Sequence, residues 1–384
     1  MSLKDRQRND PDFLSDVRKF LASGFFYFCP SSIATYDITR SIQRQTVSQT
    51  AYNSPVLDPM SRQFFWNRNF WLPFITNGIS NTSEWLVRVI CGGIEMKTVY
   101  VDSNAVRVMI ISRLSCERAG TRFTCRGSND NGHVANFVET EQIIVKDENE
   151  LSSFVQIRGS VPLQWDQAGH NLGKHFVRLS RGFEACAPAF ERHFRRLFKH
   201  YNALTVVNLL HIGPARRSSK LICEGDETAL SYWFQEHHRS SKLMENVDHI
   251  TFDFHAEWKQ EKEKCLVKLW EKLAADMTKY GFFHYADGLV RMEQNGVIRT
   301  NCIDCLDRTN CVQSMLAIQM LDSQLATLKL NERSRSNRAH FVDTLKQMWV
   351  QNGDHCSRIY AGTSAMFGGK SKVSIFSVLL FIHF

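Results

Sequence analysis

Twelve consecutive residues, RTNCIDCLDRTN from Arg299 to Asn310, contain two cysteines, two aspartates and two arginines. Five residues separate Cys302 from Arg308, the spacing that a cysteine-dependent phosphatase uses. In such a loop, backbone N–H groups surround a phosphate, a thiolate lies at the floor and the arginine binds two phosphoryl oxygens. The same positive field activates the thiol as a nucleophile. The spacing therefore predicts a phosphocysteine intermediate on Cys302, which water hydrolyses.

Other side chains of the loop have types that suit supporting roles. A leaving group needs a proton donor, and Asp304 and Asp307 are both candidates, with Asp304 preferred. Thr309 is placed to hydrogen-bond the sulfur or the attacking water, and Asn301 to brace the loop from its other end. Asn310 is expected to be the N-cap of the helix that follows.

Two other kinds of chemistry compete for the same loop. Cys302 and Cys305 have the CxxC spacing of a redox pair, but this interpretation leaves the two aspartates and Arg308 without a role. A structural zinc site needs four ligands, and no second CxxC or HxxxH of suitable spacing occurs in the chain. The phosphatase interpretation accounts for more of the loop than either alternative.

The flanking residues predict how the loop is held. Residues 296–300, GVIRT, form a short β-branched run, and residues 310–321 have helical periodicity. The apolar residues of the predicted helical face are Val312, Met315, Leu316 and Met320. A loop between a strand and a helix N-terminus receives an anion well, because first-turn N–H groups and the helix dipole attract negative charge.

The remainder of the chain predicts an α/β fold with a mixed β-sheet flanked by helices. Expected strands are residues 85–101, 105–114, 136–147, 152–165 and 204–212, which are rich in β-branched residues. Expected helices are residues 13–24, 187–202, 226–239 and 257–281, the last as one helix that ends at Gly281. A Ser-, Gln- and Pro-rich stretch predicts a domain boundary near residue 55.

Composition sets the wider limits. The 384 residues are 43% hydrophobic, enough to bury a core, and the net charge of +8 favours anionic partners. Eleven scattered cysteines indicate a reducing compartment, and the charged start has no apolar signal segment. The apolar run at residues 372–384 is shorter than the roughly twenty residues that span a bilayer.

The loop and many other segments resemble the Sac-domain phosphoinositide phosphatases. RTNCIDCLDRTN is similar to their catalytic signature over its whole length. Further similar segments, in the same order as in that family, are residues 26–44, 64–69, 111–142, 156–165, 180–194, 206–210, 280–285 and 348–370. SCERAGTRF and SRGFE are most similar to the synaptojanin branch.

The resemblance implies hydrolysis of phosphate monoesters on membrane inositol lipids without magnesium or another cofactor. The implied substrates are phosphatidylinositol 4-phosphate and 3-phosphate, with the 3,5-bisphosphate in some members. Cys302 is then the nucleophile and Arg308 the phosphate clamp, with Asp304, Asp307 and Thr309 also catalytic. The expected partners are phosphoinositide lipids and endocytic proteins, not nucleic acid, and the expected location is cytoplasmic and peripheral at membranes.

The same carry-over predicts substrate-binding residues in the loop and on one strand, namely Asn301, Ile303, Cys305, Leu306 and Arg158. Arg158 and Trp165 could orient the loop or line the headgroup site; the alternative is that both are buried residues with a structural role. Glu139 and Glu141 are candidates to hold the loop arginine, with a solvated strand face as the alternative.

Two further groups lie outside the loop. A basic run could bind lipid phosphates, or it could be an ordinary solvent-exposed surface. It consists of Arg113, Arg118, Arg122 and Arg126. Asp354 is a candidate to support the site from a distance.

The chain also departs from the family at both ends. Sac domains begin with a mostly β N-terminal subdomain, which is expected to be largely missing here, with residues 1–55 as its remnant. Residues 56–370 are then the catalytic domain and 371–384 a divergent apolar tail. Such a chain would expose apolar surface and be poorly soluble. Two rival functions stay open: a phosphoinositide- or partner-binding fragment without turnover, and a protein phosphatase.

Overall fold

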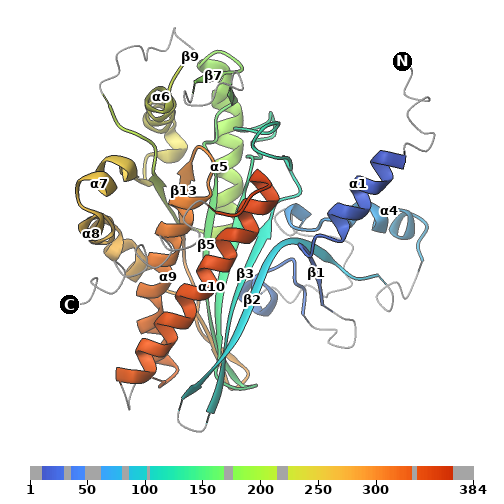
Figure 1. The fold of residues 1–384 in the computed structure, drawn as a ribbon, viewed down its shortest axis with the longest axis vertical. Coiled ribbons are helices and arrows are strands. Elements are labelled where there is room, and N and C mark those ends of the chain that lie inside the picture. The colour runs from blue at the N-terminus through green and yellow to red at the C-terminus, as the bar shows by residue number, and fades with distance from the viewer. Residues whose placement is uncertain are drawn as a thin grey trace.

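The structure is a computed structural model. It describes residues 11–29, 36–47, 62–79, 86–101, 104–167, 176–213, 224–330 and 335–365. Within these residues the predicted α/β class is confirmed, because helices cover a large mixed sheet (Figure 1). The expected boundary near residue 55 and the tail at 371–384 lie outside the described residues.

The main sheet joins an antiparallel half to a parallel half. Its strand order is β1-β2-β3-β4-β5-β13-β8-β10, and β11 pairs with β5 and β12. The strands are β1 (Phe26–Phe28), β2 (Val89–Val101), β3 (Asn104–Leu114), β4 (Val138–Val145), β5 (Glu150–Ser160), β8 (Leu204–Asn208), β10 (Asp248–Thr251), β11 (Phe283–Ala286), β12 (Leu289–Met292) and β13 (Val297–Cys302). Strands β5, β13, β8 and β10 are parallel, so their carboxyl ends lie at one edge.

A small three-stranded sheet accompanies the main one. It contains β6 (Trp165–Gln167), β7 (Val177–Leu179) and β9 (Glu224–Gly225). The expected strand at 152–165 is therefore two strands, because β5 ends at Ser160 and Trp165 starts β6. Trp165 is buried, as its structural alternative required.

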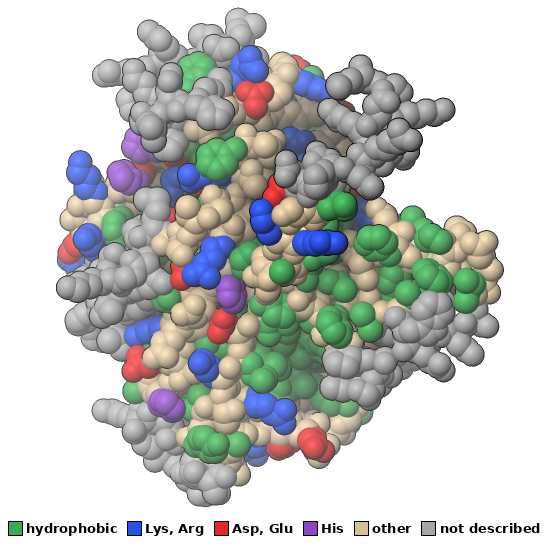
Figure 2. All heavy atoms as spheres, turned by 45° about the vertical axis from the view of Figure 1, so that its right-hand side comes forward, with side chains coloured by type: hydrophobic (Ala, Val, Ile, Leu, Met, Phe, Trp, Pro, Cys, Tyr) green, Lys and Arg blue, Asp and Glu red, His purple; other side chains and the backbone are tan. Residues whose placement is uncertain are grey.

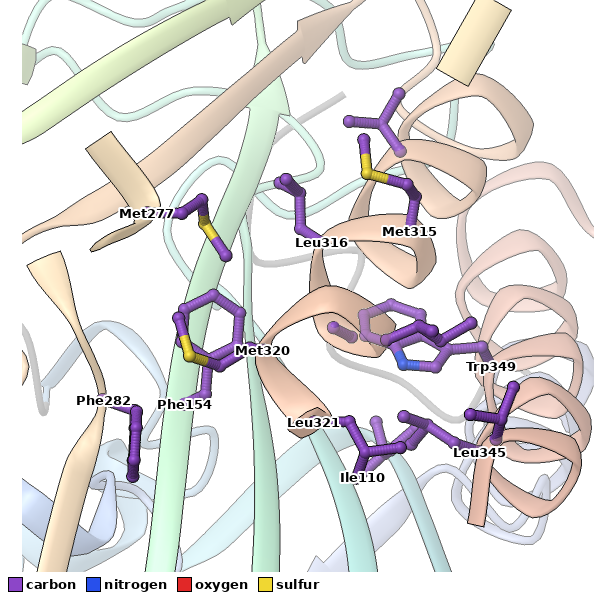
Figure 3. Packing of buried hydrophobic residues seen from close by; sticks show 14 of the residues in the cluster. Ile110, Phe154, Met277, Phe282, Met315, Leu316, Met320, Leu321, Leu345 and Trp349 are labelled. Carbon is purple, nitrogen blue, oxygen red and sulfur yellow. The ribbon is translucent and has the colours of Figure 1, made fainter. Parts of the chain in front are cut away.

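Helices cover both faces of the sheet. They are α1 (Pro11–Leu21), α2 (Ile42–Val47), α4 (Arg68–Thr76), α5 (Ala187–Tyr201), α6 (Glu227–Ser240), α7 (Phe254–Gln260), α8 (Lys262–Tyr280), α9 (Asp307–Thr327) and α10 (Arg335–Ala361). One core lies between the sheet and α8, α9 and α10, and a second lies on the α5 and α6 side. Figure 3 shows Met315, Leu316, Met320 and Trp349 packed in the first core.

The expected single helix over 257–281 is wrong. Glu261 has φ −153° and ψ 91°, so α7 ends there and α8 begins with the next residue. Phe254 and Trp258 of α7 stack on one another at 5.4 Å. Charged residues separate the apolar side chains of α7 from those of α8. These charged residues gain nothing from burial, so packing does not hold α7 and α8 as one continuous helix. The predicted end at Gly281 is confirmed.

On the face of β2 that Ile42 of α2 covers in part, two large apolar side chains are exposed. Met96 and Tyr100 are 59% and 69% exposed. Figure 2 shows apolar side chains gathered on this side of the molecule. The exposure of apolar surface through a missing subdomain and the poor solubility of the chain both stay predictions. No helix among the described residues is long and apolar enough to cross a bilayer.

Candidate active site

The loop lies where the sequence predicted, at the junction of β13 and α9. Cys302 is the last residue of β13, and α9 begins at Asp307. Arg308 is therefore in the first helical turn, next to N–H groups that have no intrahelical partner. Because β13 lies between β5 and β8, the loop is at the middle of the parallel edge.

Two side chains from outside the loop hold its carbonyl groups. Asn136 Nδ2 donates to the carbonyl oxygens of Asp304, at 2.9 Å, and Cys305, at 3.3 Å. Arg126 donates to the carbonyl oxygen of Ile303 at 3.3 Å. Since an amide is planar and trans, the N–H that follows each carbonyl points the opposite way. Cys305 has a φ of 52°, a left-handed conformation of the kind that turns successive N–H groups inward.

Arg308 is anchored at the edge of the sheet. Its guanidinium lies 2.5 Å from Glu227 Oε1 and donates to the carbonyl oxygen of Leu209 at 3.0 Å. Glu227 is the first residue of α6, whose N-cap Asp226 accepts from the N–H groups of Thr228 and Ala229. Burial is the largest single effect and lowers the pKa of Arg308, but Cys302, Glu227 and Asp304 together raise that pKa above its ordinary value. Arg308 therefore remains a fixed cation beside the thiol.

Cys302 is nearly inaccessible, with 2% of its surface exposed. Burial raises the pKa of its thiol to about 11, although the Arg308 charge works to lower it. Cys305 is also buried, and its pKa is raised to about 12, mainly by burial. Both cysteines are free thiols, and Cys305 Sγ lies 3.2 Å from the carbonyl oxygen of Cys302. In the described residues no three His, Cys, Asp or Glu side chains gather as metal ligands would.

The two candidate proton donors have different surroundings. The Asp304 carboxylate forms an ion pair with Arg126 and lies 4.0 Å from Arg122. A proton donor in this position would have to release Arg126 first. Asp307 is the first residue of α9.

Two buried arginines, Arg158 and Arg299, lie close to Cys305 of the loop. Arg158 is fully buried, and its guanidinium lies 2.7 Å from Cys356 Sγ. Arg299 donates to His193 Nε2 at 3.1 Å, and burial lowers its pKa to about 10, so it remains charged at neutral pH. Both charges lower the pKa of Cys305. Arg158 is therefore buried close enough to Cys305 for its charge to act on that thiol.

The other predicted loop residues are also brought together. Ile303 and Leu306 are buried, and the Thr309 hydroxyl donates to the Leu306 carbonyl at 3.1 Å. The side-chain nitrogen and oxygen of Asn301 have no hydrogen-bond partner among the described residues. Its carbonyl accepts from the Leu209 N–H at 3.0 Å, which joins β13 to the end of β8.

The prediction that Asn310 caps α9 is wrong. The helix begins three residues earlier, and Asn310 lies inside it. Its amide instead donates to the Trp349 carbonyl at 3.0 Å and so joins α9 to α10. Leu306, with φ −112° and ψ −90°, is the N-cap, so the helical conformation begins at Asp307, before Asn310.

Glu139 and Glu141 do not hold the loop arginine. Both are fully buried and lie 3.4 Å and 2.7 Å from Arg113. Neither of the weighed interpretations is correct, because strand pairing of β3 with β4 encloses all three charges. Glu227 holds Arg308 in their place.

The four arginines of the predicted basic run do not form one surface. Arg113 belongs to that buried cluster, while Arg118 donates to the Arg126 carbonyl at 2.9 Å. Arg122 and Arg126 reach Asp304. Asp354 is buried and accepts from the Ala365 N–H at 3.1 Å.

Sequence reasoning missed Asn136 and Glu227, and it did not connect Arg126 with the loop. Glu227 stands in an acidic cluster, EGDE, at the start of a helical pattern, which was a usable signal. Asn136 had no such signal, because its role depends on a φ of 47° and on packing.

Comparison with known proteins defines the class. The family model described as SacI homology domain matches residues 2–259, and the chain belongs to this family. The loop lies beyond the matched range.

Named relatives extend the similarity. Synaptojanin-1 from Homo sapiens is 44% identical over 366 residues, 95% of this chain. Synaptojanin from Caenorhabditis elegans is 44% identical over 358 residues, 93% of the chain. Inositol-1,4,5-trisphosphate 5-phosphatase 1 from Schizosaccharomyces pombe is 33% identical over 378 residues. The chain spans only 22%, 30% and 33% of these relatives, respectively.

Proposed function

We propose that the chain is a phosphoinositide phosphatase that hydrolyses phosphate monoesters of membrane inositol lipids through a phosphocysteine intermediate. Phosphatidylinositol 4-phosphate and 3-phosphate are the proposed substrates, with the 3,5-bisphosphate as a further candidate. The observation that carries the proposal is the pairing of Cys302 at the end of β13 with Arg308 in the first turn of α9. The name of one relative, an inositol trisphosphate phosphatase, supports phosphate esters of inositol as the substrate class.

The chemistry follows from the arrangement of the loop. Phosphate binds against the inward N–H groups, and Arg308 stabilises the charge that develops on its oxygens. Cys302 attacks phosphorus, the inositol oxygen leaves with a proton, and water then hydrolyses the phosphocysteine. Asp304 and Asp307 remain the loop residues proposed for proton transfer, and Asn301, Ile303, Cys305, Leu306 and Thr309 line or brace the cradle.

The test is phosphate release from vesicles that contain phosphatidylinositol 4-phosphate, with a chelator present. Wild type should release phosphate, and Cys302→Ser should not. Cys305→Ser is the matched control, because it changes a neighbouring buried thiol and should retain most of the activity. Release that survives Cys302→Ser would contradict the mechanism. A phosphopeptide assayed in parallel distinguishes a protein phosphatase.

One observation favours a second candidate, a module that binds phosphoinositides without turnover. The Cys302 thiol is buried and its pKa is raised to about 11, which keeps it protonated at neutral pH. Vesicle binding by folded protein without phosphate release would support this candidate. In either case we propose a cytoplasmic protein that acts peripherally at membranes. Endocytic proteins are proposed partners because the chain resembles the synaptojanin branch.

A further inference from the structure

A histidine and an aspartate form a second ionisable pair at the edge of the sheet that carries the loop. His211 follows β8, which lies beside β13 and runs parallel to it. Asp253 follows β10, the next strand outward, and is the N-cap of α7. His211 Nδ1 lies 2.6 Å from Asp253 Oδ2. No role suggested by the loop motif involves either residue.

The segment that carries His211 is fixed to the loop arginine. The Leu209 carbonyl accepts from Arg308 at 3.0 Å, and the His211 N–H donates to Glu227 Oε1 at 3.3 Å. The same Glu227 oxygen lies 2.5 Å from Arg308. The backbone of His211 is therefore bound to the same Glu227 carboxylate that positions Arg308, the phosphate clamp.

The imidazole itself is held in one orientation. Asp253 accepts from the N–H groups of Ile212, at 2.8 Å, and Ala256, at 2.9 Å, so its carboxylate is fixed before it meets the histidine. A carboxylate only accepts, so Nδ1 carries the hydrogen and Nε2 is left for another partner. Asp253 is 10% exposed whereas His211 is 48% exposed, which leaves part of the ring accessible beside the segment that binds Arg308.

We propose that His211, oriented by Asp253, takes the place of the loop aspartates Asp304 and Asp307 as the proton donor to the leaving oxygen of the substrate. The proposal rests on the proposed phosphatase function. Because the resting Cys302 is a thiol, its proton first passes to a phosphoryl oxygen of the bound substrate. As the bond from Cys302 Sγ to phosphorus forms and the bond from phosphorus to the inositol oxygen breaks, the Nε2 proton of the imidazolium passes to that oxygen. In the second step water attacks phosphorus, its proton passes to Nε2, and the thiolate of Cys302 leaves. The imidazolium is thereby restored, and Asp304 is left in its ion pair with Arg126.

The experiment compares leaving groups in wild type, His211→Gln and Asp253→Asn. A donor matters for an alcohol that leaves poorly and hardly matters for a nitrophenolate. We expect His211→Gln to reduce kcat for phosphatidylinositol 4-phosphate vesicles by about a hundredfold and kcat for 4-nitrophenyl phosphate by less than about threefold. Asp253→Asn should show the same selectivity with a smaller loss. His340→Gln, an exposed histidine on α10, is the control and should match wild type.

A second measurement separates proton transfer from a structural role. Added imidazole should restore lipid hydrolysis in His211→Ala, because a free donor can replace the missing ring. Equal losses for both substrates together with no rescue would overturn the proposal, and so would no loss at all. Activity that persists in Cys302→Ser would instead contradict the phosphatase mechanism, so the two failures are distinguishable.

Discussion

The reactivity of Cys302 is set by burial and by three charges from different segments. Burial raises the pKa of the thiol, and Glu227 and Asp304 raise it further, whereas Arg308 lowers it. Burial is the largest of these effects, so the resting thiol is protonated at neutral pH. Each charge that is removed should therefore change thiol reactivity in a known direction.

Alkylation of Cys302 by iodoacetamide should increase with pH until the pH reaches about 11. Only the thiolate reacts, and its fraction rises about tenfold for each pH unit below the pKa. The rate is measured by mass spectrometry of the peptide that contains Cys302. A rate that levels off below pH 8 would show that the Arg308 charge outweighs burial.

Glu227→Gln should separate thiol reactivity from catalysis. Loss of the anion lowers the pKa of Cys302, so alkylation at a fixed pH should become faster. Phosphate release should fall by about ten- to a hundredfold, because Arg308 loses a charge-assisted bond of about 1.5–3 kcal/mol. Glu236→Gln, later in the same helix and paired with Arg239, is the control. Parallel changes in both rates would contradict this separation.

Two helix N-termini meet at the site. The first turn of α9 carries Arg308, and the first residue of α6 carries Glu227, so the ion pair joins the starts of the two helices. The start of α6 is fixed by Asp226, which accepts from two N–H groups of the first turn. The precision of the phosphate clamp therefore depends on a cap in another element.

Asp226→Ala should reduce both stability and activity. Loss of an N-cap costs about 1 kcal/mol of unfolding free energy, and a frayed first turn moves Glu227 away from Arg308. Urea unfolding and kcat/KM measure the two effects. Asp322→Ala, which removes a partly exposed ion pair between α9 and α10, should cost about 1 kcal/mol or less and leave kcat/KM unchanged. Full activity in Asp226→Ala would show that the cap does not position Glu227.

A buried charge cluster joins the N-terminal segment to the main sheet. Arg113 of β3 donates to the carbonyl oxygens of Ile38, at 2.7 Å, and Arg40, at 3.0 Å. Glu141 of β4 pairs with Arg113 and accepts from the Ile42 N–H at 2.8 Å. Residues 36–47 are thus held against the sheet by groups that water does not reach.

Glu141→Ala should strongly destabilise the whole molecule. Removing one partner of a buried ion pair leaves Arg113 without full compensation and costs about 3–5 kcal/mol. The matched control is Glu117→Ala, because Glu117 pairs with Arg68 at a partly exposed position and its loss should cost about 1 kcal/mol or less. Urea unfolding measures both variants, and equal stabilities would contradict the role of the cluster.

The sequence alone determined the long elements and the central pair of the site. Strands β2 to β5 and helices α5, α6 and α9 follow from the period of their apolar residues, because burial of one face is a local property of the pattern. The spacing of Cys302 and Arg308 is equally local, since it is read directly from the order of residues between a β-branched run and a helical pattern.

Only the tertiary structure decided which groups serve that pair. Glu227 is 81 residues from Arg308, and Asp304 meets Arg126 across 178 residues. Glu139 and Glu141 looked equally suitable, but strand register directed them to Arg113. His211 and Asp253 come together because two parallel strands end at the same edge. Such partners depend on sheet order and register, which no local pattern of residue types specifies.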